Sequence, residues 1–206
     1  MTKPVEPVIL YVRQMEEIKK RINVINFFLS VRGSALYLQS TVESICLQFR
    51  KILELIAFAS LIANKTAYSA VHKNFSSHHK SDILLKELRR INPNFYPVPI
   101  TPKPKLVNGI LMPDLIKTGY LTPDDFVDVF KKCGRLLHVG NPYAGMISIA
   151  YYQKTFPVWL EKIVQLLNTH EVHFVDDSTM WIINMKEDGD DKVHFHVFEL
   201  FENQTK

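Results

Sequence analysis

The feature that most constrains the fold is a long stretch without proline or glycine, which runs from Ala35 to Lys65. Its sequence is ALYLQSTVESICLQFRKILELIAFASLIANK, and apolar residues recur in it every three or four positions, as on one face of an α-helix. The members of this stripe are Leu38, Val42, Ile45, Phe49, Ile52, Ile56 and Ala59. We therefore expect a long amphipathic helix at the centre of a helical bundle.

Further helical patterns lie on both sides of this stretch. An amphipathic pattern from Pro7 to Ser30 predicts a first helix, with Gly33 as its stop and Ser34 as the cap of the next. The segment DILLKELRRI predicts a short helix with Asp82 as its N-cap. Two closing helices are expected, one in YAGMISIAYYQKT with its cap at Asn141, and one in FPVWLEKIVQLLNTH.

The clearest helix start is in LTPDDFVDVFKKCGRLLHVGNP. Thr122 is expected at the N-cap and Pro123 at the first helical position, followed by two aspartates near the positive end of the helix dipole. The pattern predicts an end near Gly140. At about 100° per residue, one side of this helix is apolar. The members of that side are Phe126, Val129, Phe130, Cys133 and Leu137.

Arg135 and His138 share the opposite, polar face of this helix. An imidazole can exchange a proton at neutral pH, and a guanidinium can hold two phosphate oxygens. Together they suffice for metal-independent attack of a ribose 2′-hydroxyl on the adjacent phosphodiester, with Asn141 adding a hydrogen bond to the phosphate or to His138. The alternative is a solvated face on which Asp128, Lys131, Lys132 and Arg135 pair at spacings of three and four residues and His138 complements the negative end of the helix.

Two residues of the long helix, Arg50 and Glu54, are four positions apart and can form an ion pair. A structural role for this pair, in fixing the helix register, is favoured over a direct catalytic role.

The segments FRKILELI, LTPDDF and GRLLHVGNP, in their order along residues 34–168, resemble the HEPN superfamily of all-helical domains. Many members of this family are ribonucleases that act as dimers. The residues that carry the resemblance are Arg50, Leu53, Glu54, Arg135, His138 and Asn141. The family usually has a longer spacer between its arginine and histidine, with a polar residue after the arginine, whereas here Leu136 and Leu137 fill the spacer.

The resemblance implies a homodimeric, metal-independent endoribonuclease that cleaves RNA at a composite site, of the kind found as toxins or in antiviral and phage defence. In this hypothesis His138 is the general acid or base, Arg135 binds the scissile phosphate and Asn141 helps to orient the groups. Arg50 and Glu54 would brace the site from behind. The alternative is a non-catalytic helical module for dimerisation or for binding a protein partner such as an antitoxin, so enzymatic activity stays open.

The composition agrees with a globular chain. Of its 206 residues 47% are hydrophobic and 22% are charged, and the net charge of +4 permits an RNA partner without indicating one. Two cysteines, Cys46 and Cys133, fall in apolar helical patterns and are expected to be buried thiols in a reducing cytoplasm. The absence of a long apolar run or an export pattern leads us to expect no membrane span.

The period changes to that of β-strands near the C-terminus. The runs VHFV, MWIINM and KVHFHVFEL predict strands, the last two as a hairpin, and KLVNGILM predicts a small hairpin within the proline-rich part. The predicted fold is mainly α, a HEPN-like helical bundle with a small C-terminal antiparallel sheet. Residues 1–170 would form the bundle, with an irregular excursion over 92–122, and residues 171–206 a β-hairpin extension packed on the same domain.

Two histidine pairs are candidate metal ligands. His170 and His173 are expected at the end of the last helix, and His194 and His196 on one face of a strand. No recognised spacing joins them, so no metal or other cofactor is expected. The basic segment KELRR either contacts RNA backbone or, as we favour, forms an ordinary solvated face.

Overall fold

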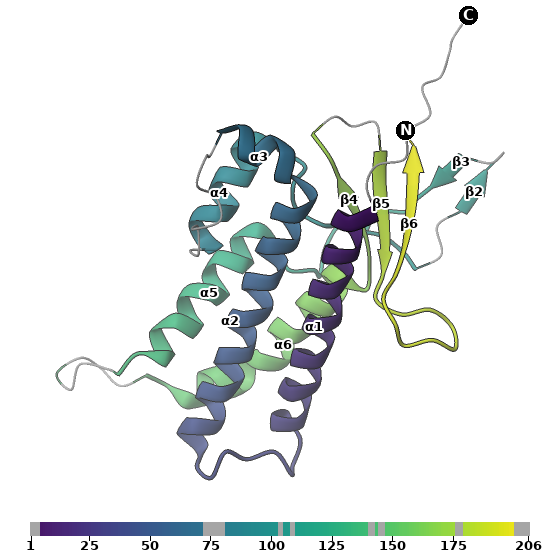
Figure 1. Cartoon of the computed structure of the whole chain (residues 1–206). Coiled ribbons are helices and arrows are strands. Elements are labelled where there is room, and N and C mark those ends of the chain that lie inside the picture. The colour runs from purple at the N-terminus through teal and green to yellow at the C-terminus, as the bar shows by residue number, and fades with distance from the viewer. Residues whose placement is uncertain are drawn as a thin grey trace, which may run out of the picture.

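The computed structural model describes residues 5–71, 81–102, 105–107, 110–139, 143, 147–175 and 179–199. Within this part the chain is mainly helical and carries a small antiparallel sheet, which confirms the predicted fold class (Figure 1). The helices are α1 (Val5–Leu29), α2 (Leu38–Ala63), α3 (Lys65–Val71), α4 (Ser81–Ile91), α5 (Pro123–Leu137) and α6 (Ile149–Leu167). The strands are β1 (Val98–Pro99), β2 (Lys105–Val107), β3 (Ile110–Met112), β4 (Thr169–His173), β5 (Thr179–Asn184) and β6 (His194–Glu199).

The predicted helix stripe of α2 is buried from its second member onward. Only Leu38, at the start of the helix, is exposed. The other six form the centre of a core to which α1, α5, α6 and the sheet also contribute. In this core Phe49 of α2 packs against Phe156 and Trp159 of α6, with ring centroids 5.6 Å away in each case. Burial of such large aromatic surfaces holds α2 and α6 together.

The turn between α1 and α2 differs from the prediction. The helix α1 ends at Leu29, four residues before the predicted stop Gly33, and the turn needs glycine there because a Cβ would clash with the carbonyl oxygen of Phe27. Ser34 does not cap α2, since the helix begins only at Leu38. The intervening Leu36 takes a left-handed conformation with a φ of 71°, which a branched side chain rarely adopts and which keeps the backbone out of the helix.

Two other helix boundaries were predicted wrongly. Asp82 is not an N-cap, since α4 already begins at Ser81. The two closing helices are one helix, α6, which is capped by Ser148 and continues through Pro157. Pro157 is exposed, while neighbouring Phe156 and Trp159 are buried, so core packing outweighs the hydrogen bond that the proline removes. The predicted cap Asn141 lies outside the described residues.

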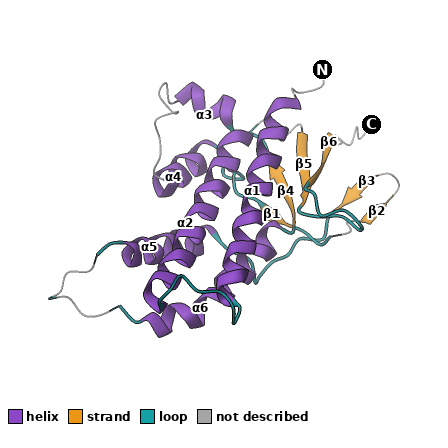
Figure 2. Ribbon diagram, turned by 60° about the horizontal axis from the view of Figure 1, so that its bottom comes forward, coloured by secondary structure: helices purple, strands orange, loops and turns teal. Residues whose placement is uncertain are grey.

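The strands lie on one side of the bundle, next to α1 (Figures 1 and 2). The main sheet has the order β1-β4-β5-β6 and is antiparallel throughout, which confirms the C-terminal hairpin and adds β1, which the sequence did not predict. One face joins the helical core through Trp181 and Ile183, and the other carries a small cluster around Ile182. The hairpin β2–β3 pairs as predicted, although its turn lies outside the described residues. Among the described helices, none combines the length and apolar character that a bilayer crossing requires.

Candidate functional site

Helix α5 is held firmly at its start. The Thr122 hydroxyl accepts a hydrogen bond from the backbone N–H of Asp125, and the Asp125 carboxylate accepts one from the backbone N–H of Thr122, at 3.1 Å each. This capping box confirms Thr122 as the predicted N-cap, with Pro123 in the first turn, and adds the reciprocal bond of Asp125, which was not predicted from the sequence. Asp125 also bonds the Lys162 ammonium of α6 at 2.8 Å. Burial raises the pKa of the Asp125 carboxyl, but the hydrogen bonds from Lys162 and Thr122 together hold it below its ordinary value. The start of α5 is therefore fixed to α6.

The opposite end of α5 carries Arg135 and His138. Both side chains are exposed, as the helical wheel predicts, and His138 is the C-cap, with an extended backbone at φ −94° and ψ 143°. Within the described part of the chain, neither side chain makes a hydrogen bond or an ion pair. Asn141, the third predicted site residue, lies outside the described residues. In one copy of the chain the pair is thus accessible but is not oriented by any other described side chain.

The buried side of α5 differs from the wheel in its last turn. Leu136 is buried, at 2% exposure, whereas the predicted Leu137 is only half-buried. After Cys133 the next buried apolar residue is therefore Leu136 and not Leu137. Packing against the neighbouring helices, and not the helical repeat alone, decides which side of the last turn is covered.

Arg50 reaches from α2 to α5 directly behind this site. Its guanidinium lies 4.0 Å from the centre of the Phe130 ring, and a Cβ on Gly134 would be 2.6 Å from one of its nitrogens. Gly134 therefore leaves the space in which Arg50 rests on α5. The predicted ion pair with Glu54 is long, at 4.0 Å, and Lys51 is closer to that carboxylate, at 3.1 Å. Arg50 braces the two helices chiefly through Phe130 and Gly134, a role for which the glycine in GRLLH is the only sequence signal.

Two thiols lie in the same interface. Cys46 of α2 and Cys133 of α5 are both free and buried, in agreement with the prediction of buried thiols. A hydrogen bond to Cys133, together with burial, raises the pKa of the Cys46 thiol, so Cys46 remains protonated and unreactive at neutral pH.

A cleft of about 370 Å³ lies between α4 and α5. Its walls carry both apolar and charged side chains. They are Leu85, Lys86, Arg89, Phe95, Pro123, Asp124, Val127, Asp128 and Lys131. The α5 members of this wall are spaced so that they continue toward Arg135 and His138 along the same side of the helix.

The predicted placement of His170 and His173 at a helix end is wrong, because both lie on strand β4. His170 is wholly buried. Its Nδ1 lies 2.8 Å from the carbonyl oxygen of Leu167, so Nδ1 donates, and Nε2 then accepts from the Tyr11 hydroxyl, also at 2.8 Å. Burial lowers the pKa of His170 to about 4, so this imidazole is neutral at physiological pH and serves to connect α1 with β4.

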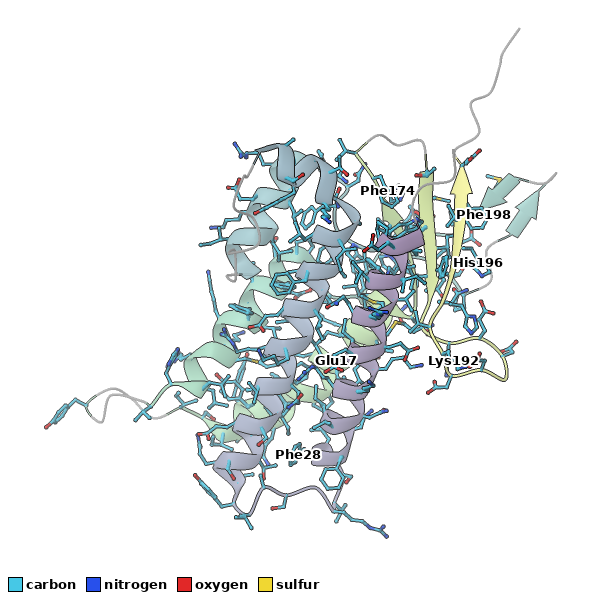
Figure 3. The ribbon with its side chains drawn as sticks, viewed as in Figure 1. Glu17, Phe28, Phe174, Lys192, His196 and Phe198 are labelled. Carbon is cyan, nitrogen blue, oxygen red and sulfur yellow. The ribbon has the colours of Figure 1, made fainter. Side chains whose placement is uncertain are left out.

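The two histidines of β6, His194 and His196, each lie beside a carboxylate. His194 lies 3.2 Å from an oxygen of Asp190, and His196 lies 3.2 Å from an oxygen of Glu187. His196 is on the side of the molecule away from α5, beside the loop of Lys192 (Figure 3). In residues that the structure describes, no group of three or more His, Cys, Asp or Glu side chains is arranged to hold a metal ion.

No protein-family model, curated protein or solved structure matches this chain at a significant level. The geometry of the α5 region therefore carries the functional argument.

Proposed function

We propose that the chain is a homodimeric, metal-independent endoribonuclease. In this proposal His138 is the general acid or base and Arg135 binds the scissile phosphate. The observation that carries it is the exposure of both side chains, one turn apart at the end of α5, with no hydrogen bond or ion pair to either of them in the described part of the chain. Cleavage by the ribose 2′-hydroxyl needs one group that moves a proton and one that stabilises the phosphate charge, and this pair can supply both.

In this proposal a second copy of the chain completes a site that the described residues of one copy leave open. Efficient catalysis requires groups held in a fixed geometry, and no described side chain orients the His138 imidazole. Two α5 ends that meet across a dimer would supply a second arginine and enclose the phosphate. Arg50 would support each end from behind through Phe130 and Gly134. A toxin or antiviral role in the cytoplasm is part of the same proposal and rests on the HEPN resemblance.

The test is cleavage of end-labelled RNA by purified protein in excess EDTA. His138→Ala should lower the rate by about 10² to 10⁴, the usual contribution of one general acid or base. Arg135→Ala should also lower it strongly. His196→Ala is the matched control, since it removes another exposed histidine, on β6, and should leave the rate unchanged. Equal cleavage by wild type and His138→Ala would show that the activity does not use this site.

The second candidate is a non-catalytic dimerisation module, and the α1–α2 turn favours it. Exposed apolar side chains gather on this turn and on the helix ends beside it. They are Val24, Phe27, Leu29, Val31, Leu36, Tyr37 and Leu38. Val31 and Leu36 are fully exposed, and no acidic residue occurs between Glu17 and Glu43. This apolar turn and the end of α5 point toward the same end of the bundle (Figure 1), so a second copy bound here would bring two α5 ends near each other.

The mass of the protein in solution tests this contact. Wild type should be a dimer, and the double variant Val31→Asp/Leu36→Asp should be a monomer, because the charges oppose burial of the apolar turn. Val158→Asp/Val197→Asp makes the same change at two half-exposed positions elsewhere and should remain dimeric. A monomeric wild type would overturn both the dimer contact and the composite nuclease site. A dimer without RNA cleavage would leave the dimerisation module as the function.

A further inference from the structure

Helices α4 and α5 carry two kinds of cation. Arg90 and Lys132 are paired within their own helices, with Glu87 at 2.9 Å and with Asp128 at 2.7 Å. Four others, Lys86, Arg89, Lys131 and Arg135, are exposed and make no ion pair or hydrogen bond in the described part of the chain. These unpaired cations can bind an external anion without first giving up an internal partner.

The α5 cations lie on one line of the helix. Lys131, Arg135 and His138 are separated by four and then three residues, which places them on the same face within about 60°. At about 1.5 Å of rise per residue, they extend over roughly 10 Å along the helix axis. Asp124 and Val127, which line the α4–α5 cleft, belong to the same face of α5. The cleft and the candidate catalytic pair are therefore successive parts of one surface.

The cleft adds the α4 cations to this line. Lys86 and Arg89 of α4 line the cleft together with Lys131 of α5, and Phe95 and Val127 contribute apolar surface to the same lining. Of the two acidic residues in the wall, Asp128 is already paired with Lys132, so the surface keeps a positive charge. Cations in a groove retain more of their attraction for an anion than cations on an open surface.

From this placement we propose that the α4–α5 cleft binds the phosphate backbone of single-stranded RNA and directs it along α5 to Arg135 and His138. The proposal deepens the nuclease function and rests on it for the choice of RNA. A flexible polyanion fits better than a single phosphate, because the cations are spread along a line and do not converge on one point. It also fits better than a lipid surface, because a flat bilayer cannot follow cations that line a cleft.

Binding of a fluorescently labelled single-stranded RNA, measured by anisotropy in the His138→Ala background, tests the proposal without cleavage. The variant Lys86→Gln/Arg89→Gln/Lys131→Gln should bind roughly tenfold or more weakly. Its plot of log affinity against log salt should be shallower by about 2, since each lost phosphate contact removes about 0.7. The control Lys65→Gln/Lys117→Gln/Lys192→Gln removes the same charge from exposed positions elsewhere and should bind as its parent does.

Each outcome separates this inference from the nuclease proposal. If the cleft variant binds RNA weakly and the wild type does not cleave RNA, the proposal that the α4–α5 cleft binds RNA stands and the nuclease proposal is overturned. If the cleft variant and the control variant bind RNA equally well, the proposal that the α4–α5 cleft binds RNA is overturned, even if the wild type cleaves RNA. Competition by poly-glutamate as effective as that by RNA of equal length overturns RNA as the ligand and indicates an acidic protein partner.

Discussion

Two regions of the molecule use histidine in opposite ways. At the α1–β4 contact His170 is buried, and both of its ring nitrogens are hydrogen-bonded, to Leu167 and to Tyr11. At the end of α5 His138 is exposed and has no partner in the described part of the chain. A satisfied, dry imidazole with a pKa of about 4 cannot exchange protons efficiently at neutral pH. A buried polar group whose hydrogen bonds are all made within the fold serves to stabilise the structure. An accessible polar group without such bonds can bind a ligand.

The two histidines should differ most in their contribution to the free energy of unfolding. His170→Ala should lower the free energy of unfolding by about 3 kcal/mol, because it leaves a cavity and strips Tyr11 and Leu167 of their partner. His138→Ala should change it by less than about 0.5 kcal/mol, as is usual for an exposed position. Urea unfolding followed by circular dichroism measures both. Similar losses for the two variants would remove the distinction between the regions.

Acid sensitivity should come from the buried histidine. Its pKa is lowered from 6.5 to about 4 on folding, so between these values the unfolded chain binds a proton that the folded chain does not. The stabilisation is complete above pH 6.5 and is lost as the pH falls toward 4. Its loss between pH 7 and pH 5 should be about 2 kcal/mol. Urea unfolding at each pH should show this loss in wild type and in His138→Gln, and a smaller loss in His170→Gln.

The hydroxyl of Tyr11 should contribute a smaller amount. Tyr11→Phe keeps the ring in the core but leaves the Nε2 atom of His170 without its donor. The expected cost is about 1 to 2 kcal/mol, the penalty of one unsatisfied buried acceptor. Tyr37→Phe is the matched control on an exposed tyrosine and should be nearly neutral. An unchanged midpoint in thermal unfolding of Tyr11→Phe would mean that the His170 nitrogen finds another partner.

The smallest effect concerns the contact of the Arg50 side chain with Phe130 and Gly134 of α5. Gly134→Ala gains up to about 1 kcal/mol of helix propensity but displaces the Arg50 guanidinium from its place over Phe130. The two contributions should nearly cancel. In an Arg50→Ala background the same substitution should stabilise the protein by up to about 1 kcal/mol, because the space is then free. A double-mutant cycle of thermal unfolding measures this difference, and strict additivity would contradict the contact.

Local patterns predicted the elements that depend on nearby residues. The N-cap at Thr122, the apolar stripe of α2 and the hairpins β2–β3 and β5–β6 all follow from short spacings, and all are present. The exposure of Arg135 and His138 also followed from helical periodicity. The helix through Pro157 did not, because the sequence shows the cost of the proline but not the core packing that outweighs it.

What the sequence determined by itself is which faces are apolar, where most helices and hairpins lie, and which polar residues of α5 meet solvent. Three features depend on packing between distant segments: His170 lies on a buried strand, Arg50 rests on Gly134, and Lys86 and Arg89 share a cleft with Lys131. The physical reason is that periodicity acts over a few residues, whereas these contacts join segments far apart in the chain. Their geometry exists only after the core has packed.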